Sequence, residues 1–331
     1  MLNPERDYTQ HDGTVYRIQI SGQHFNNQNA SGYEVAVKHL SMPENQFFTQ
    51  ASQTLKTMRD LQHPHLIRAH SVINRGMDKC FVFPYAEEGD LAHFWKSHDT
   101  ESEPNVMSWA LMQMRGLADG VNKLHEKETS HGDIKPQNIL IFNNTENHQK
   151  TLVIADIGLA KYRALNMRKK YDDMDIVPIS NKGRYEPPEI AIRASPISHS
   201  YDIWSLGCVL LEFIIWLVSG PRGFEDFLRE STNRDSDRFW ENRLVKPVIA
   251  DRIAALENKL EQQGEEHIAL KRVLNLIRER LLVGVYSRAN SAELFENIDG
   301  IYSQYLSHHN VFHSSEPQLQ SAEGNHATSA A

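Results

Sequence analysis

Near its middle the chain reads His131-Gly132-Asp133-Ile134-Lys135-Pro136-Gln137-Asn138-Ile139-Leu140, a polar loop that runs directly into apolar residues. The apolar residues predict that the loop is anchored on a strand, which fixes its polar side chains in space. Asp133 can accept a proton, Lys135 can reach a phosphate, and Asn138 offers an amide oxygen to Mg²⁺. A plain polar turn before a strand would account for the turn but not for this choice of side chains.

Four further strings accompany this loop in a fixed order. Val35-Ala36-Val37-Lys38 lies upstream, and downstream follow Asp156-Ile157-Gly158, Tyr185-Glu186-Pro187-Pro188-Glu189 and Asp202-Ile203-Trp204-Ser205-Leu206-Gly207. The ordered set resembles the signature of the eukaryotic protein kinase family, from about residue 13 to about residue 301. The segments Pro-Pro-Glu and Trp-Ser-Leu-Gly separate the chain from small-molecule kinases of related fold. A small-molecule phosphotransferase is therefore the weakest of the candidate functions.

Shorter segments refine this resemblance. His63-Pro64-His65-Leu66-Ile67 and Phe83-Pro84-Tyr85 occur together with a His-Gly-Asp variant of the catalytic loop. This combination is similar to Ser/Thr-type kinase domains that are common in filamentous fungi. Lys135 is the feature that favours Ser or Thr over Tyr as the acceptor, by resemblance.

The resemblance implies an α+β, two-lobed protein-kinase-like fold, with a small β-rich N-lobe and a larger α-helical C-lobe. Short β-branched and aromatic runs up to Phe83, with helical spacing over residues 46–61, predict the N-lobe at residues 1–86. Helical patterns predict the C-lobe at residues 87–306. Residues 307–331 are rich in His, Ser, Gln, Asn and Ala, which predicts a disordered tail. The start of the chain leaves little room for a first strand, so this strand and the glycine-rich loop are predicted to be truncated or degenerate.

Composition and charge argue against some functions and some cellular locations. The 331 residues are 40% hydrophobic, which is ordinary for a globular protein, and the net charge of −8 argues against a nucleic-acid binder. Residues 204–218 are apolar but few, and they include Glu212, so we expect a buried helix rather than a membrane span. The two cysteines, Cys80 and Cys208, lie in apolar runs, and buried free thiols predict an intracellular protein, cytoplasmic or nuclear.

The family resemblance assigns roles to individual residues, with ATP and Mg²⁺ as the implied cofactors. Asp133 orients the acceptor hydroxyl, Lys135 and Lys38 hold phosphates, and Asn138 and Asp156 hold the metal. The residues implied in ATP binding are Val15 and Ala36 above the adenine, Leu140 below it, Phe83, Pro84 and Ala86 in the hinge, Asp90 near the ribose, and Lys38. Asp90 is explained equally well as a surface acid without a role in ATP binding. Glu189 and Arg288 resemble the family's buried structural ion pair.

The N-lobe departs from the family pattern at two places. Tyr8 and Gln10 stand where glycines normally let backbone amides close over phosphates. The helix that should pair with Lys38 has no glutamate, because none occurs between residues 45 and 86. Counting back from His63-Pro64 places Thr54 at the expected position, with Gln50 and Gln53 as alternatives.

The C-lobe departs at two more. Gly132 replaces the arginine that would bind a phosphate on the activation segment, so activation by phosphorylation of that segment is not predicted, although Ser180 or Tyr171 could still be modified. Lys182 replaces the threonine that supports the catalytic aspartate.

The leading hypothesis is a Ser/Thr protein kinase that acts on protein substrates. The alternative is a pseudokinase, a scaffold that binds nucleotide or partners with little or no turnover.

Overall fold

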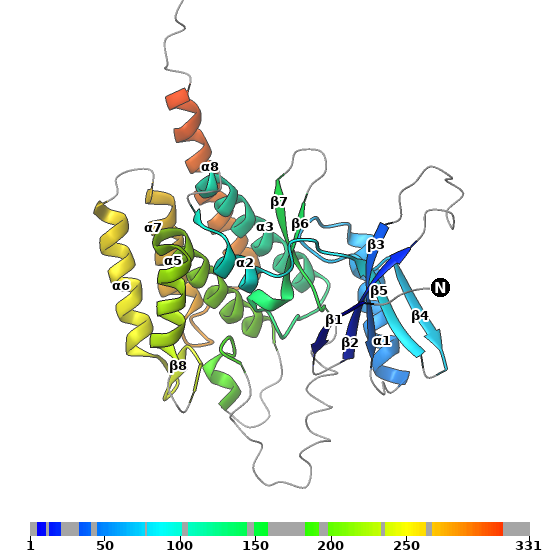
Figure 1. The fold of residues 1–331 in the computed structure, drawn as a ribbon. Helices are drawn as coiled ribbons and strands as arrows, with labels where there is room; N and C mark the ends of the chain where they lie inside the picture. Colours follow the sequence, from blue (N-terminus) through cyan, green and yellow to red (C-terminus); the bar gives the residue numbers. More distant parts are fainter. Residues whose placement is uncertain are drawn as a thin grey trace, which may run out of the picture.

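The computed structural model describes residues 5–10, 13–20, 33–40, 45–76, 78–100, 105–143, 149–157, 183–191, 198–232, 236–262 and 267–313. A β-rich lobe precedes a helical lobe along the chain, and the two lie side by side (Figure 1). The predicted two-lobed α+β fold is therefore confirmed.

The N-lobe is an antiparallel sheet with strand order β1-β2-β3-β5-β4. Its strands are β1 (Glu5–Gln10), β2 (Gly13–Ile20), β3 (Tyr33–Leu40), β4 (Ser71–Arg75) and β5 (Asp78–Pro84). The first strand spans six residues and pairs with β2, with a shift in register between Arg6 and Tyr8. Tyr8 and Gln10 thus belong to strand β1.

One helix, α1 (Asn45–Leu61), packs against this sheet, as the spacing of its apolar residues predicted. Phe48, Leu55 and Met58 are buried on one face of α1, and the Phe48 ring stacks on Phe81 of β5 at 5.2 Å. The burial of this face joins helix and sheet into one core.

The C-lobe begins with α2 (Leu91–Ser97) and α3 (Val106–Glu126), followed by η3 (Pro136–Asn138), the hairpin of β6 (Ile139–Asn143) and β7 (Lys150–Ile154), and η5 (Pro188–Ala191). After these come α5 (His199–Ser231), the short pair β8 (Trp240–Glu241) and β9 (Leu244–Val245), α6 (Pro247–Gln262), α7 (Ile268–Leu276), η7 (Ile277–Leu281) and α8 (Ser291–His313). α8 continues past Leu306, where the sequence predicted the tail to begin, and residues 314–331 lie outside the described part.

Helix α5 is the centre of the C-lobe core. Among the described helices it alone is long and apolar enough to cross a membrane, and 78% of its most apolar window is buried inside the protein. Its regular geometry breaks at Gly220, where φ is 66° and Pro221 follows. Burial within the protein accounts for the apolar composition, as predicted for residues 204–218.

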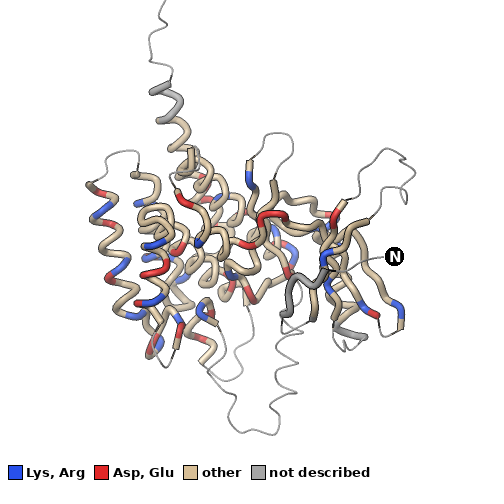
Figure 2. Tube along the Cα trace, in the orientation of Figure 1, with Lys and Arg blue, Asp and Glu red and all other residues tan. Residues whose placement is uncertain are grey.

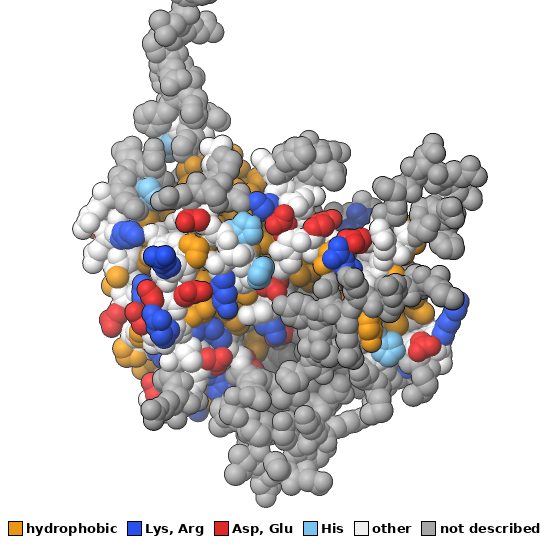
Figure 3. Space-filling view, in the orientation of Figure 1, with side chains coloured by type: hydrophobic (Ala, Val, Ile, Leu, Met, Phe, Trp, Pro, Cys, Tyr) orange, Lys and Arg blue, Asp and Glu red, His pale blue; other side chains and the backbone are white. Residues whose placement is uncertain are grey.

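Charged residues are distributed over the helical lobe without segregation by sign. Acidic and basic positions alternate along α6 (Figure 2). On the face drawn in Figure 3, basic and acidic side chains are likewise interspersed over the helices.

Candidate active site

The catalytic loop is held by a buried carboxylate from α5. Asp202 is fully buried and accepts hydrogen bonds from the backbone N–H groups of His131, at 2.8 Å, and Gly132, at 2.7 Å. His125 Nε2 of α3 lies 2.9 Å from the same carboxylate. These partners compensate for the cost of burying the charge. Gly132 has a φ of 73°, a left-handed conformation in which a glycine is unstrained, and this is the position where the family carries arginine.

The His131 ring connects this loop to the end of β7. Its Nε2 donates to the carbonyl oxygen of Ala155 at 2.7 Å, while its Nδ1 accepts from the backbone N–H of Asp133 at 3.2 Å. A neutral imidazole that is protonated at Nε2 satisfies both contacts. The ring is fully buried, so it sets the distance between the catalytic loop and Asp156.

Asp133 is fixed by the two residues that the sequence grouped with it. Lys135 Nζ lies 2.9 Å from Asp133 Oδ2, and Asn138 Nδ2 donates to the same oxygen at 2.8 Å. Asn138 Nδ2 also donates to the Asp133 carbonyl at 2.8 Å. The carboxylate therefore has a defined direction, and it remains half-buried, within reach of a substrate.

Asn138 and Asp156 are brought together by the β6–β7 hairpin. The backbone N–H of Ala155 donates to the Asn138 carbonyl at 2.8 Å, which places Asp156 one residue from that contact. Because Asn138 uses its amide nitrogen toward Asp133, its amide oxygen is the atom left to bind a cation. One carboxylate and one amide oxygen suit Mg²⁺, which keeps several waters and takes further oxygens from phosphates. Within the described residues, no group of three or more His, Cys, Asp or Glu side chains lies in a position to hold a metal ion.

Lys38 and Asp156 form a buried ion pair across the two lobes. Lys38 Nζ lies 2.8 Å from Asp156 Oδ1 and 2.7 Å from Oδ2. The Lys38 side chain is 3% exposed and that of Asp156 is 12% exposed. Asp156 has a φ of 64°, an uncommon conformation for a residue other than glycine. Ile157 is fully buried in the hydrophobic core.

The helix residues considered as partners of Lys38 differ in their exposure. Gln50 and Gln53 are exposed on α1, whereas Thr54 is half-buried. Thr54 is thus the least exposed of the three, although the fully buried face of α1 is formed by other residues.

The residues assigned to adenine gather on one face of the N-lobe sheet. Val15 pairs with Lys38, and Ala36 pairs with Phe83, so alternation along the strands places all four on the same face. Phe83 is buried, and Val15 and Ala36 are half-buried. The sheet therefore forms the roof over the place where an adenine would lie.

The opposite wall comes from β6 of the C-lobe, and the hinge begins at the end of β5. Asp90 and Leu140 form an isolated β-bridge, which places Leu140 beside the segment that follows Pro84 and Ala86. Pro84, Ala86 and Leu140 are half-buried. Asp90 caps α2 by accepting from the backbone N–H of His93 at 2.9 Å, so one of its oxygens already has a structural role.

Glu189 and Arg288 form the ion pair that the sequence implied. Arg288 Nη1 lies 2.6 Å from Glu189 Oε1, and Arg288 Nη2 lies 3.0 Å from Oε2. The Arg288 side chain is fully buried, and it also donates to the carbonyls of Val283 and Ser200. The two-pronged pair ties η5 to the segment before α8. Gly158, Tyr171, Ser180 and Lys182 lie outside the described residues.

A second buried pair was missed by sequence reasoning. Arg184 Nε lies 2.6 Å from Glu212 Oε1, and the Tyr185 hydroxyl donates to Glu212 Oε2 at 2.8 Å. Burial raises the pKa of Glu212, and burial beside this carboxylate also raises the pKa of Tyr185 well above its usual value. The signal was present, because a glutamate within an all-apolar helix requires a buried partner.

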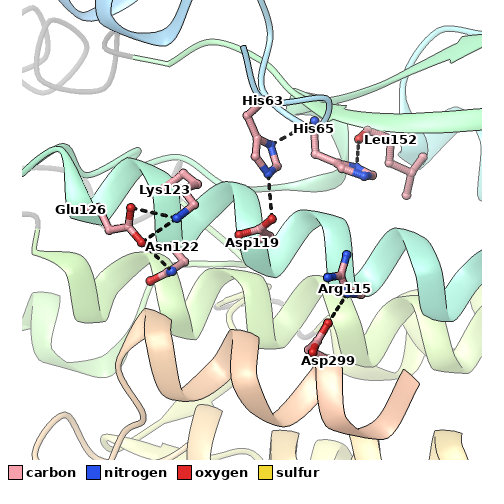
Figure 4. A network of polar contacts seen from close by, with 9 residues as sticks. All are labelled: His63, His65, Arg115, Asp119, Asn122, Lys123, Glu126, Leu152 and Asp299. Carbon is pink, nitrogen blue, oxygen red and sulfur yellow. Dashed lines mark hydrogen bonds and ion pairs between the residues drawn. The ribbon is translucent and has the colours of Figure 1, made fainter. Parts of the chain in front are cut away.

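A contact between the segment after α1 and helix α3 was also missed (Figure 4). His63 Nε2 lies 3.2 Å from Asp119 Oδ2, and His65 Nδ1 donates to the Leu152 carbonyl at 2.7 Å. The backbone of this segment continues the contact, since the N–H of Ile154 donates to the His65 carbonyl at 2.8 Å. The N-lobe helix is therefore connected to the C-lobe close to Asp156.

Comparison with known proteins agrees with this architecture. Residues 21–289 match the family described as Protein kinase domain, a range that begins after β2. The chain is 32% identical over 185 residues to human cyclin-dependent kinase 15, covering 55% of this chain and 39% of that protein. It is 30% identical over 174 residues to cyclin-dependent kinase 17 of Caenorhabditis elegans, covering 52% and 24%. It is 28% identical over 198 residues to cyclin-dependent kinase 14 of Callithrix jacchus, covering 59% and 43%. The chain spans less than half the length of these relatives. The family match covers most of the chain, which therefore belongs to the protein kinase domain family.

Proposed function

We propose that this chain transfers the γ-phosphoryl group of ATP to Ser or Thr hydroxyls of protein substrates, with Mg²⁺ as the metal. The observation that carries the proposal is the fixed geometry of Asp133, whose carboxylate is held by Lys135 at 2.9 Å and Asn138 at 2.8 Å. Phosphoryl transfer depends mainly on positioning and charge neutralisation, and these three side chains supply both.

The transfer step assigns each residue a role. The substrate hydroxyl oxygen forms a bond to the γ-phosphorus as the bond to the bridging oxygen breaks, and ADP leaves with that electron pair. Asp133 accepts the hydroxyl proton, and Lys135 lies close enough to neutralise charge on the transferring group. Bound Mg²⁺ would be held by Asn138 and Asp156 and would neutralise phosphate charge. Lys38, on the N-lobe sheet, is another cation of the described part of the site.

The test is transfer of labelled phosphate from ATP with Mg²⁺ to the protein itself and to a generic basic substrate. The relatives are named for dependence on cyclins, so the assay is run with and without an added cyclin. Asp133→Asn should reduce transfer to background. The control is Asp226→Asn, because Asp226 lies on α5, is 51% exposed, and pairs with Arg229 one turn away. Unchanged transfer in Asp133→Asn would refute the assignment.

The pseudokinase is kept as a second candidate because of one observation. Lys38 is bound by Asp156, while the helix glutamate required for full activity in the family is missing. Absence of transfer in the folded wild-type protein would favour this function. A thermal shift with ATP and Mg²⁺ then separates a nucleotide-binding scaffold from one that binds none, since ligand at a hundred times its Kd adds about 2.7 kcal/mol.

For location, we propose an intracellular protein, cytoplasmic or nuclear. The support is that Cys80 and Cys208 are both buried free thiols. Burial raises the pKa of each thiol, which keeps them protonated and unreactive.

A further inference from the structure

The face of the N-lobe sheet that carries the predicted adenine contacts also carries a cation, Arg17 of β2. Arg17 pairs with Ala36 of β3, and Ala36 pairs with Phe83 of β5. Because the partners in an antiparallel pair point to the same face, Arg17 lies on the face of Ala36 and Phe83. It also follows Val15 by two residues, which places both on that face. Arg17 therefore stands next to the residues that are expected to cover an adenine.

The guanidinium group of Arg17 contacts both an acid and an aromatic ring. Its Nε donates to Glu34 Oε1 at 2.9 Å, and its Nη2 donates to Glu34 Oε2 at 2.8 Å. The guanidinium carbon lies 4.6 Å from the centroid of the Tyr85 ring. Two parallel bonds to one carboxylate fix the plane of the guanidinium, and a cation over an aromatic face is attracted to the ring. These contacts join β2 and β3 to the residue that follows β5.

Tyr85 belongs to the hinge and lies between the two residues whose backbone is expected to face the adenine, Pro84 and Ala86. Pro84 has no N–H, so it cannot donate a backbone hydrogen bond where the chain leaves the sheet. A side-chain contact at Tyr85 adds an attachment that the backbone of Pro84 does not provide. Because the peptide units on both sides of Tyr85 are planar, fixing this residue also restricts the Pro84 carbonyl and the Ala86 N–H.

We propose that Arg17 is a positioning residue for nucleotide binding, which together with Glu34 and Tyr85 forms a clamp that fixes the hinge against the N-lobe sheet. The inference rests on the proposed ATP site. The clamp contacts the hinge and not the phosphate-binding residues, so it acts on nucleotide affinity by ordering the hinge before the nucleotide arrives. The Arg17 and Glu34 side chains are 38% and 32% exposed, so the gain in affinity is modest.

The test measures the Kd of ADP in the presence of Mg²⁺ by titration calorimetry. Arg17→Met retains an unbranched side chain without the charge and should raise the Kd about fivefold. Tyr85→Leu removes the ring and should raise the Kd by a similar factor. The double variant should bind no more weakly than either single variant, because both substitutions remove the same contact. Arg75→Met is the matched control, since Arg75 is an exposed arginine on the edge strand β4, and its Kd should change less than about twofold.

Conservative variants separate the clamp from a general effect on the fold. Tyr85→Phe keeps the aromatic face and should recover the affinity that Tyr85→Leu loses. Arg17→Lys keeps the charge but not the two parallel bonds to Glu34, so its Kd should lie between those of wild type and Arg17→Met. Circular dichroism confirms the fold of each variant. An equal loss of affinity in Tyr85→Phe and Tyr85→Leu would overturn the proposal.

The remaining outcomes distinguish this inference from the proposed function. Independent, multiplicative effects of Arg17→Met and Tyr85→Leu, or an unchanged Kd in Arg17→Met, would remove the clamp and leave the nucleotide site in place. A wild-type protein that binds no ADP would remove the nucleotide site, and the clamp and the proposed function with it. A protein that shows the expected coupling but transfers no phosphate supports the clamp and removes the kinase activity.

Discussion

Gly116 of α3 lies directly beneath the imidazole of His65: a Cβ added to Gly116 would stand 2.0 Å from His65 Nε2. The ring cannot retreat without losing its 2.7 Å hydrogen bond to the Leu152 carbonyl. Glycine at this position therefore allows the segment after α1 to reach the helix. The contact is one of the points at which the N-lobe helix is fixed relative to the catalytic loop.

Gly116→Ala should accordingly destabilise the protein by about 1–3 kcal/mol, the usual cost of overpacking. Urea unfolding measures this change. Gly300→Ala is the control, because Gly300 lies in α8 and a Cβ there would meet no atom within 4 Å. Alanine has the higher helix propensity, so the control should be neutral or stabilising by up to about 1 kcal/mol. Equal effects of the two substitutions would contradict the close packing.

The free energy of unfolding should decrease as the pH is lowered from neutral, because the folded state keeps the His65 ring neutral. Burial lowers the pKa of His65 to about 4, from 6.5 in the unfolded chain. The folded state thus favours the neutral ring, and its contribution is complete above pH 6.5 and is lost as the pH falls toward 4. Between pH 7.5 and 5 the loss amounts to about 2 kcal/mol.

The free energy of unfolding at these two pH values tests this in wild type and His65→Asn. Asparagine does not titrate, and its amide can still donate a hydrogen bond. The variant should lose about 2 kcal/mol less than wild type between the two pH values. An identical pH dependence would show that His65 does not carry the effect.

The ion pair between Arg288 and Glu189 should be costly to break from one side. Arg288→Met leaves the Glu189 carboxylate, which is 13% exposed, without its charge partner. Loss of one member of a buried pair costs about 3–5 kcal/mol. Thermal unfolding measures the loss. The double variant Arg288→Met/Glu189→Leu should recover part of it, because no unpaired charge remains.

An exposed pair provides the comparison. Arg229 is 78% exposed and pairs with Asp226 one turn away on α5. Arg229→Met should change the free energy of unfolding by less than about 1 kcal/mol. A similar loss in both arginine variants would mean that burial does not determine the strength of the Arg288–Glu189 pair.

Asp202 should act on the rate of transfer through the catalytic loop, in line with the proposed kinase activity. Its two oxygens accept from the backbone N–H groups of His131 and Gly132. Asp202→Asn replaces one acceptor oxygen by a donor group, which faces another donor and displaces the loop. We expect kcat to fall tenfold or more while the KM for ATP changes little. A lower affinity for ATP with unchanged kcat would contradict a positioning role.

Much of the candidate site was predictable because its residues are close together in the chain. Asp133, Lys135 and Asn138 lie within one short loop, and the structure joins them by contacts of 2.8–2.9 Å. The helix of residues 46–61 followed from the period of its apolar residues, and the buried helix around residue 210 followed from its continuous apolar run. The residue pairs Glu189–Arg288 and Asn138–Asp156 came from the family resemblance and not from spacing.

The sequence alone determined the set of reactive groups and the absence of a helix glutamate, since both depend only on which residues are present. The tertiary structure decided which groups meet. Lys38 and Asp156 are 118 residues apart, and their contact depends on how β3 and the end of β7 are packed around the same core. The contact of Gly116 with His65 and the burial of Arg184 against Glu212 arise in the same way. Whether two such groups interact depends on their distance and their desolvation in the folded protein. A local sequence pattern contains neither quantity.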